Sequence, residues 1–337
     1  MRILSVAWEC PQEPYGGLGV FISKLLPEMT VKHDVDHFCL HGYRRPLIPE
    51  NYHGARVVRL REPAVDRNGG VMVLTAVMLG GELLSTLPTY DAVIAHDIHG
   101  SLVVASAKEL GVKSTYYVHL WTFSPLDITA VDSADDAAAN SKLTASQISS
   151  TAGREVRVVY PASPYPPADT PSNGSLEGEK TIVIPSRWQG NKNPSHILSV
   201  LEDVRKRVSV KVVVFGRGAE LYKLPDWVIN VGTVSEEEKL GLYRKADLVV
   251  QVGFPEPFGL VALEAVSQGS PVLVSNQSGV SEVLPPESTY TLENLADKII
   301  QLLTNKSERE ELWWKQRTSW IMQRTWRDVW RELEKKL

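Results

Sequence analysis

This 337-residue sequence lacks the compositional features that identify disulfide-rich, nucleic-acid-binding or membrane-spanning proteins. Only two cysteines occur, Cys10 and Cys39, so that no disulfide framework is expected and a reducing cytosol is favoured. The formal net charge is −4, which argues against a general nucleic-acid binder. The most apolar stretch, residues 71–84, is too short and too rich in glycine to span a bilayer. The N-terminal MRILSVAWE lacks the apolar core and the cleavage site of a signal peptide, and we therefore expect a cytoplasmic protein.

What the sequence does contain is enough length and apolar content for two folded domains. Hydrophobic residues make up 43% and charged residues 23%, which is ordinary for a globular protein with sizeable cores. Short apolar runs, rich in Val and Ile and mostly without polar alternation, are typical of strands buried on both faces. They predict strands at residues 3–7, 35–40, 55–60, 92–95, 114–118, 156–159, 181–185, 211–215, 248–252 and 271–274.

Helical patterns separate these runs, and the alternation predicts parallel sheets covered by helices. Ser235 followed by Glu238 predicts a capping box at one helix start. Residues 160–180 interrupt the alternation with five prolines, which fix φ and lack a donor, so that we interpret them as an interdomain linker. Ligands are then expected in a crevice between the domains, outside the carboxyl ends of the strands. The predicted helices include residues 21–29, 102–110, 194–207 and 235–246.

The C-terminal residues 308–337 have a long helical pattern in which tryptophans recur among basic and acidic residues. An amphipathic helix that packs its aromatic stripe on a domain surface is one interpretation. A helix that binds a membrane surface or a partner is the other, although the acidic residues weaken the membrane version. The tryptophans concerned are Trp313, Trp320, Trp326 and Trp330.

Two glutamates stand eight positions apart in the stretch GFPEPFGLVALEAVSQGSPVLVSN, residues 253–276. Glu256 follows the predicted strand 248–252 and precedes a predicted helix over residues 258–268. It should therefore lie at the carboxyl end of a strand, beside helix N–H groups that could bind an anion or a hydroxyl. Glu264 lies on that helix, near Ser267 and Gln268 on a helical wheel, so that a solvent-facing position is equally open.

Two further stretches could bind phosphate. In PSRWQGNKNP, Arg187 and Lys192 just past a strand could grip a diphosphate, or they could be two solvated loop cations. In the loop ECPQEPYGGLGV, glycines let backbone approach a phosphate at a helix N-terminus, or they form a flexible turn. These glycines are Gly16, Gly17 and Gly19.

Polar residues also follow other predicted strands. AHDIHG places His96, Asp97 and His99 at one strand end, and His119 ends another. The His-x-x-His spacing could suggest a metal, but a single acid at one strand end gives it little support, and we expect no metal. Gly216 in VFGRGAE follows a third strand and is typical of a turn.

In combination these motifs resemble the retaining glycosyltransferases of family 4 and their glycogen-synthase relatives. The similarity covers nearly the whole chain and is strongest over residues 179–285, while AWECPQEPYGGLG is most similar to the glycogen-synthase-like branch. It implies the α/β GT-B fold, with two Rossmann-like domains whose parallel sheets face each other across a cleft and a C-terminal helix that returns to the first domain. The implied parts are an acceptor-side domain (1–160), a linker (161–178), a nucleotide-sugar domain (179–312) and a crossover helix (313–337). The matching residues include Gly259, Gly269, Pro271, Gly279 and Glu282.

The resemblance also implies roles for residues of the second half. Glu264 would bind the ribose hydroxyls of a nucleotide sugar, since a carboxylate can accept two hydroxyl hydrogen bonds. Glu256 would contact the donor sugar near its 3- and 4-hydroxyls. Arg187 and Lys192 would neutralise the leaving diphosphate, and Gly216 would lie near the base and diphosphate. The backbone amides that would assist Glu256 are those of Phe258, Gly259 and Leu260.

In the first half, the resemblance places His119 next to the sugar-bearing phosphate and Asp97 near the acceptor. The loop of Gly16, Gly17 and Gly19 would face the diphosphate and the acceptor.

The activity that this resemblance implies is transfer of a hexose, with glucose as the expected sugar, from a nucleoside diphosphate sugar to an acceptor hydroxyl with retention. The partners are then the donor and a glycan or small-molecule acceptor, such as an α-glucan, without nucleic acid, an integral membrane segment or any cofactor. A non-catalytic subunit that binds a nucleotide sugar or glycan is the alternative, because the first half is short. An NAD enzyme is disfavoured, since no complete GxGxxG occurs.

Overall fold

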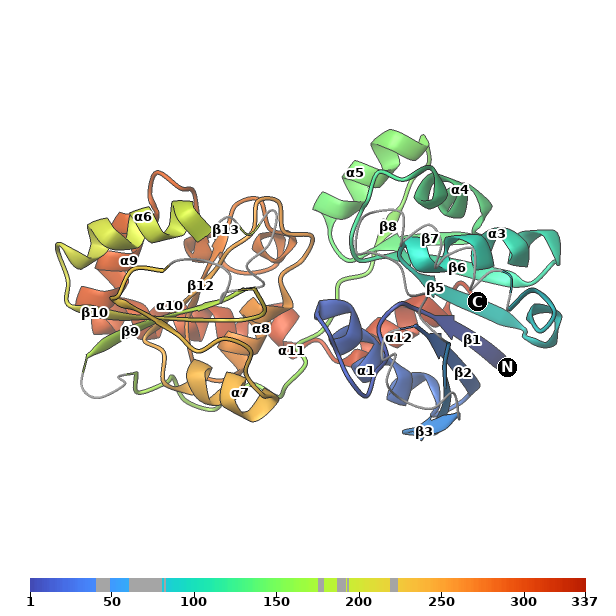
Figure 1. Ribbon diagram of the computed structural model, residues 1–337, viewed down its shortest axis with the longest axis horizontal. Coiled ribbons are helices and arrows are strands. Elements are labelled where there is room, and N and C mark those ends of the chain that lie inside the picture. The colour runs from blue at the N-terminus through green and yellow to red at the C-terminus, as the bar shows by residue number, and fades with distance from the viewer. Residues whose placement is uncertain are drawn as a thin grey trace. The chain divides into compact units, whose positions relative to one another are not determined.

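The computed structural model describes residues 1–40, 49–60, 81, 83–174, 179–186, 192, 194–218 and 224–337 (Figure 1). The chain forms two compact units, one of Met1–Pro161 with Thr325–Leu337 and the other of Ala162–Arg324. No helix within the described ranges is long and apolar enough to cross a membrane.

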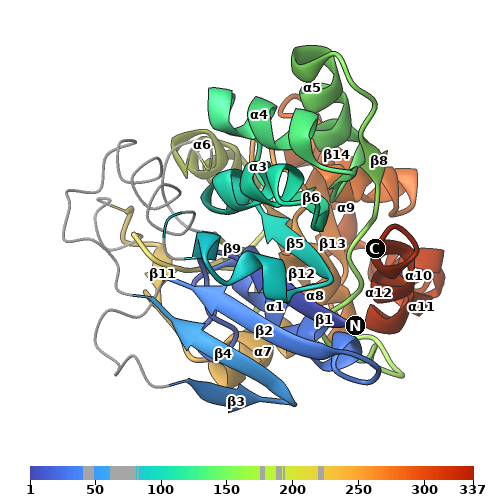
Figure 2. The ribbon, with the colours of Figure 1, turned by 90° about the vertical axis from the view of Figure 1, so that its right-hand side faces the viewer.

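The first unit is built on an eight-stranded sheet in the order β3-β4-β2-β1-β5-β6-β7-β8. Every neighbouring pair is parallel except β3 and β4, which are antiparallel. Figure 2 shows β3, β4, β2 and β1 side by side in this order. The strands are β1 (Arg2–Val6), β2 (Asp34–Cys39), β3 (Glu50–Tyr52), β4 (Ala55–Arg59), β5 (Ala92–His96), β6 (Lys113–Val118), β7 (Asp136–Ala139) and β8 (Arg157–Val158).

Helices pack on this sheet because each buries an apolar face that water would otherwise solvate. Helix α3 contacts β5, β6 and α4, and α1 contacts α12, which comes from the end of the chain. The helices of the first unit in the described residues are α1 (Gly17–Met29), α3 (Ser101–Glu109), α4 (Pro125–Ser133), α5 (Lys142–Ala152) and α12 (Trp326–Glu334), with the 3-10 turns η1 (Leu87–Thr89) and η2 (Ile98–Gly100).

The second unit has a six-stranded, wholly parallel sheet in the order β11-β10-β9-β12-β13-β14. Its strands are β9 (Lys180–Pro185), β10 (Val210–Phe215), β11 (Val228–Asn230), β12 (Leu248–Gln251), β13 (Val272–Ser275) and β14 (Thr289–Tyr290). Its helices in the described residues are α6 (Pro194–Arg205), α7 (Glu236–Arg244), α8 (Leu260–Ser267), α9 (Leu295–Thr304), α10 (Lys306–Thr318) and α11 (Trp320–Gln323), with η4 (Gly279–Glu282) and η5 (Pro286–Ser288).

The sequence-based prediction of parallel sheets covered by helices is therefore confirmed for both units. Each of the predicted strands is present, with ends that differ by a residue or two. The predicted capping box is also present, since the Ser235 side chain accepts from the backbone of Glu238 and the Glu238 side chain accepts from that of Ser235.

The prediction of one crossover helix over residues 313–337 is wrong, because this range does not form one continuous helix. The segment contains the end of α10, then α11 and α12, because Ser319 and Thr325 adopt extended backbone conformations that interrupt the helix. Only Thr325–Leu337 joins the first unit, and Trp313 is buried within the second.

The tryptophans of α12 pack on the first unit, as the simpler interpretation proposed. The Trp326 ring lies 5.2 Å from the Phe21 ring of α1, between centroids, and the Trp330 ring lies 5.6 Å from that of His33. His33 Nε2 also lies 2.8 Å from Glu334 Oε1. These contacts give the aromatic face of α12 an intramolecular partner and remove the need for a membrane or a second protein there.

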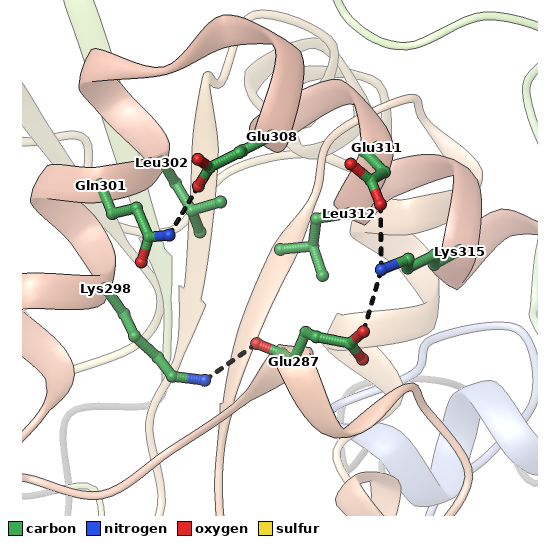
Figure 3. A pocket seen from close by; sticks show the side chains of 8 residues that line it. All are labelled: Glu287, Lys298, Gln301, Leu302, Glu308, Glu311, Leu312 and Lys315. Carbon is green, nitrogen blue, oxygen red and sulfur yellow. Dashed lines mark hydrogen bonds and ion pairs between the residues drawn. The ribbon is translucent and has the colours of Figure 1, made fainter.

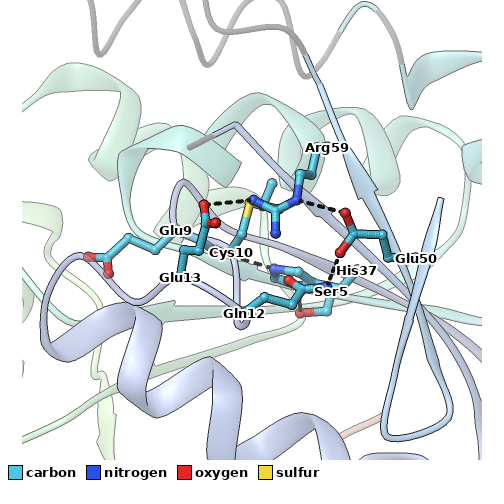
Figure 4. Close-up of a disulfide and its surroundings, with 9 residues drawn as sticks. Ser5, Glu9, Cys10, Gln12, Glu13, His37, Glu50 and Arg59 are labelled. Atoms are coloured by element: carbon cyan, nitrogen blue, oxygen red, sulfur yellow. Dashed lines mark hydrogen bonds and ion pairs between the residues drawn. A yellow bond between two sulfur atoms is a disulfide. The ribbon is translucent and has the colours of Figure 1, made fainter. Parts of the chain in front are cut away.

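Cys10 and Cys39 form a disulfide, although the sequence led us to expect no disulfide framework. The two residues follow β1 and end β2, and the parallel pairing of these strands brings their Cα atoms to 5.4 Å. Figure 4 shows the disulfide beside Arg59, whose guanidinium pairs with Glu13 and Glu50. The bond removes one ground on which a reducing cytosol was expected.

Replacing Trp330 by alanine should lower the free energy of unfolding by about 3–5 kcal/mol, because the side chain is almost wholly buried and a cavity would remain. Arg327→Ala on the same helix is the matched control and should cost less than about 0.5 kcal/mol, since that side chain is largely exposed. Urea denaturation followed by circular dichroism measures both. Equal stability of Trp330→Ala and the wild type would contradict the packing of α12 on the first unit.

Candidate active site

The loop between β12 and α8 carries Glu256 at the carboxyl end of a parallel strand, as the sequence predicts. Its backbone is paired with the segment after β13: the N–H of Glu256 donates to the carbonyl of Gln277 (2.9 Å), and the N–H of Gly279 donates to the carbonyl of Glu256 (3.0 Å). The peptide bond between Phe254 and Pro255 is cis. The carboxylate therefore extends from a backbone that two neighbouring strand ends hold in place.

Lys192 and Glu256 form an ion pair, which brings two predicted site residues together. Their side chains are only 17% and 14% exposed, so that the pair is shielded from much of the solvent. Gly253 makes room for it, because a Cβ there would lie 3.0 Å from Lys192 Nζ and 2.9 Å from Glu256. Arg187, the other predicted cation, lies outside the described residues.

The N-terminus of α8 lies directly after this loop. Gly259 is its N-cap with φ +100°, a left-handed conformation that favours glycine. Ser278 Oγ and the N–H of Val280 both donate to the carbonyl of Phe258, at 2.9 and 2.8 Å, which fixes the turn. Because a helix leaves its first N–H groups without intrahelical acceptors, the turn that begins at Leu260 is suited to an anion or hydroxyl.

Glu264 is buried, and the solvent-facing alternative is therefore wrong. Lys239 Nζ lies 3.2 Å from Glu264 Oε1, and Tyr243 Oη donates to Oε2 at 3.3 Å. Burial raises the pKa of Glu264, and the charge of Lys239 opposes this rise. Burial would lower the pKa of Lys239, but the carboxylates of Glu264 and Glu236 outweigh it and raise that pKa. The pair thus has an ammonium that stays charged at neutral pH.

Gly216 follows β10 with φ +126°, and its N–H donates to the carbonyl of Gly232 at 2.8 Å. The positive φ explains why glycine occupies this turn. The predicted turn after β10 is confirmed, while a contact with a base or diphosphate remains a prediction.

In the first unit, the glycine-rich loop encloses an internal anion. Glu9 Oε2 accepts from the N–H groups of Tyr15 (2.7 Å), Gly16 (2.7 Å) and Gly19 (2.9 Å), and the side chain is buried. Gly16 is the N-cap of α1, which begins at Gly17. Donors that the sequence offered to an external phosphate therefore bind a carboxylate of the chain itself.

The polar residues after β5 and β6 meet in one cluster. Asp97, with φ +55°, accepts from the N–H groups of His119 (2.6 Å) and Leu120 (3.1 Å) through Oδ1. His96 Nδ1 lies 3.1 Å from His119 Nε2, and the Asn140 amide donates to the carbonyl of His119 at 2.9 Å. A positive φ at a residue other than glycine is a strained conformation that is common at functional sites.

Burial dominates the protonation of this cluster. It lowers the pKa of His119 to about 3, that of His99 to about 4 and that of His96 well below its usual value. Burial also raises the pKa of Asp97 to about 8, against the two N–H groups that favour its ionised form. The histidines are thus neutral hydrogen-bonding groups at pH 7, and no charge on His119 is available to stabilise a phosphate.

Within the described parts of the chain, no three His, Cys, Asp or Glu side chains come together as a metal site would require. A pocket of about 240 Å³ lies over α9, α10 and η5, and no predicted site residue lines it (Figure 3). Its charged groups pair among themselves, as Lys315 does with Glu287 (2.9 Å) and Glu311 (3.1 Å).

Known proteins with similar sequences are glycosyltransferases. Residues 167–318 match the family model described as glycosyl transferases group 1. A glycosyltransferase of Methanocaldococcus jannaschii is 26% identical over 85% of this chain and 83% of its own length. The glycogen synthase of Mycobacterium tuberculosis (strain H37Rv) is 27% identical over 84% of this chain and 80% of its own length.

Solved structures with the same fold include the sucrose-phosphate synthase of Thermosynechococcus elongatus, with a TM-score of 0.80 and 15% identity over 99% of this chain and 97% of that one. The lipopolysaccharide outer core galactosyltransferase WaaB has a TM-score of 0.69 and 16% identity over the whole of both chains. The fold is therefore GT-B, and the sequence matches support the group 1 glycosyltransferase superfamily. The chain is a transferase enzyme of the glycosyltransferase class.

The contributors to these clusters that are absent from the sequence-based prediction include Glu9, Asn140, Lys239 and Tyr243. Glu9 is the first residue of the loop ECPQEPYGGLGV, and this position was a signal that the sequence offered. Lys239 and Tyr243 are four residues apart on α7, but only the packing of α7 on α8 shows what they bind.

Replacing Asp97 by asparagine should remove a pH-dependent loss of stability. The folded carboxyl holds its proton up to about pH 8, whereas an unfolded Asp has a pKa of about 3.9. Unfolding therefore releases a proton between these values, and the wild type loses stability as pH rises through this window. The variant keeps an oxygen for the N–H groups of His119 and Leu120. The difference in free energy of unfolding, variant minus wild type, should therefore increase from pH 4 to pH 8 when both are measured in urea. Parallel profiles would contradict the raised pKa.

Gly19→Ala should destabilise the protein by about 1–3 kcal/mol, because its Cβ would lie 2.4 Å from Glu9 Oε2 and 2.7 Å from Pro14 Cα. Gly241→Ala within α7 is the control. Its Cβ meets open space, and alanine should stabilise that helix by up to about 1 kcal/mol. Thermal unfolding compares the two variants, and a neutral Gly19→Ala would show that Glu9 does not require this glycine.

Proposed function

We propose that this enzyme transfers a hexose, with glucose as the expected sugar, from a nucleoside diphosphate sugar to an acceptor hydroxyl with retention of configuration. In this proposal it belongs to glycosyltransferase family 4, in the glycogen-synthase-like branch. The observation that carries the proposal is a set of groups that follow β9 and β12: the Glu256–Lys192 pair beside the N-terminus of α8, and the buried Glu264 on that helix. The similarity to a glycogen synthase over most of both chains supports it.

The proposed chemistry depends on stabilising the leaving diphosphate. Negative charge develops on the phosphate oxygen as the sugar–phosphate bond breaks, and groups already in place stabilise it most effectively. Lys192 supplies a cation, and the N–H groups at the start of α8, from Leu260 onward, supply a helix N-terminus. The resemblance assigns a second cation to Arg187. The acceptor attacks the face from which the diphosphate leaves, and its proton passes to the departing phosphate oxygen, so that atoms and charge balance without a metal.

The two carboxylates would divide the recognition of the donor. Glu256 would accept from sugar hydroxyls, a role that becomes open once the diphosphate replaces it as an anionic partner of Lys192. Glu264 would accept from the ribose hydroxyls. In the first unit, the neutral His119 would contribute hydrogen bonds to the sugar-bearing phosphate, and Asp97 would lie on the acceptor side. The resemblance assigns Gly216 to the surroundings of the base and diphosphate, and the loop of Gly16, Gly17 and Gly19 to those of the diphosphate and acceptor.

The acceptor is proposed to be a glycan, with an α-glucan as the first candidate because of the similarity to a glycogen synthase. No metal or other cofactor takes part in the proposed reaction. The proposed location is the cytoplasm, which suits a nucleotide-sugar donor.

Lys192→Ala and Glu256→Ala should each lower kcat for glucosyl transfer by about 10²–10³-fold, the cost of removing one group that stabilises the transition state. Lys245→Ala is the control, because that lysine is an exposed residue at the end of α7 and should leave kcat unchanged. Release of nucleoside diphosphate from UDP-, ADP- and GDP-glucose with glycogen as acceptor measures the rate. NMR of the product gives its anomeric configuration, and EDTA should not change the rate.

Full activity in both site variants would refute the assigned roles. An inverted product would refute retention, and loss of activity with EDTA would refute a metal-free mechanism. Calorimetric binding of a nucleotide sugar without turnover, for any acceptor tried, would instead identify a non-catalytic binding subunit.

A further inference from the structure

Helix α7 supplies two side chains that bind Glu264, the carboxylate proposed to recognise the donor's ribose. Lys239 and Tyr243 are four residues apart, so that they lie on the same face of the helix. Lys239 Nζ lies 3.2 Å from Oε1, and Tyr243 Oη donates to Oε2 at 3.3 Å. Each carboxylate oxygen thus has its own donor, and the orientation of the carboxylate is fixed from two points.

This arrangement leaves Glu264 able to accept from a ligand. A carboxylate oxygen has two lone pairs, so that one bond to each oxygen leaves one acceptor position on each. Two adjacent acceptor positions at a fixed orientation suit two hydroxyl groups on neighbouring carbons. The pairing with α7 is therefore compatible with binding a diol and need not be broken by it.

Lys239 is itself held in place from three sides. Its Nζ lies 3.0 Å from Glu236 Oε2, one turn earlier on α7, and 5.7 Å from the centre of the Tyr165 ring. The ammonium thus lies between two carboxylates and against an aromatic face, which restricts the motion of a long side chain. The side chain is 15% exposed, so that little water competes for these contacts.

We propose that Lys239 is a positioning residue, which orients the Glu264 carboxylate for the vicinal hydroxyls of the donor's ribose; this rests on the proposed function. Lys239 acts through Glu264 and not on the reacting atoms. It should therefore determine the affinity for the nucleotide part of the donor and have little influence on the transfer step.

Lys239→Met tests this, since methionine keeps much of the apolar stem and removes the ammonium. We expect KM for the nucleotide sugar to rise about tenfold, the equivalent of about 1.4 kcal/mol, with kcat within about twofold of the wild type. Lys239→Arg keeps a cation and should recover most of the affinity. The matched control Lys245→Met removes an exposed lysine from the end of the same helix and should change neither constant. A fall in kcat at unchanged KM, or the same effect in Lys245→Met, would overturn the proposal.

The pH dependence of KM gives a readout that loss of packing would not move. The titratable groups that act on the Glu264 carboxyl within the described residues are Lys239, Tyr243 and Glu236, all from α7. Burial raises the pKa of Glu264, and removing the ammonium leaves only the hydrogen bond from Tyr243 to oppose this rise and the repulsion from Glu236. Protonation removes acceptor capacity, so that donor affinity should fall at low pH in both proteins. In Lys239→Met the fall should begin at a higher pH, and unchanged profiles would contradict the proposal.

A double-mutant cycle of Lys239→Met and Glu264→Gln separates this proposal from the function on which it rests. Measured by urea unfolding without any nucleotide, the cycle should show coupling between the two residues, because they contact each other directly. Additive effects together with normal donor binding in the wild type would refute the proposed role of Lys239 and leave the proposed function intact. Coupling together with no calorimetric binding of UDP-, ADP- or GDP-glucose to the wild type would refute the proposed function, and the donor role of Lys239 with it.

Discussion

A carboxylate removed from water must be paired, and this constraint organises the polar clusters in both units. Glu9 is held by three N–H groups of the glycine-rich loop, and Asp97 by two that follow β6. Glu256 and Glu264 are held mainly by the side chains of Lys192 and Lys239. The pairings of Glu9, Asp97 and Glu256 fix loops next to the carboxyl ends of strands, while that of Glu264 joins α8 to α7. The shape of each cluster therefore depends on the partners of its acids as much as on the acids.

The two kinds of partner have different consequences for binding. N–H groups belong to the backbone and are fixed in place, so that a ligand can take them from Glu9 or Asp97 only if it displaces the buried carboxylate. An ammonium at the end of a flexible stem can exchange one anion for another with little movement. The Lys192–Glu256 pair is of this second kind, and a diphosphate could replace the glutamate as partner of the lysine. Glu256 could then accept from sugar hydroxyls while Lys192 binds the diphosphate, which are the roles that the resemblance gives them.

Much of the fold was predictable because buried parallel strands require uninterrupted Val and Ile runs, as in β9 and β10. Strand β7, with the sequence DAAA, escaped prediction because it contains no Val or Ile, and alanine has the highest helix propensity of all residues. The disulfide escaped because spacing along the chain does not show that β1 and β2 are neighbours. The burial of Glu264 could not be decided from a helical wheel, which contains no information about α7. Individual strands and helices could thus be predicted from the sequence, whereas contacts between them could not.

The glycine-rich loop shows why a motif and its chemistry must be separated. Its glycines do lie at the N-terminus of α1, where an anion is favoured, but the anion there is Glu9. Gly19 is required because the carboxylate fills the space that a Cβ would occupy. Because the N–H groups of Gly16 and Gly19 already donate to Glu9, the loop is better suited to shape the surface beside a ligand than to donate these hydrogen bonds to it. In the proposed reaction, neutralising the diphosphate would then fall to groups outside the loop, and burial keeps His119 uncharged at pH 7. Among the described residues, the Lys192 ammonium and the N-terminus of α8 remain the groups best suited to it.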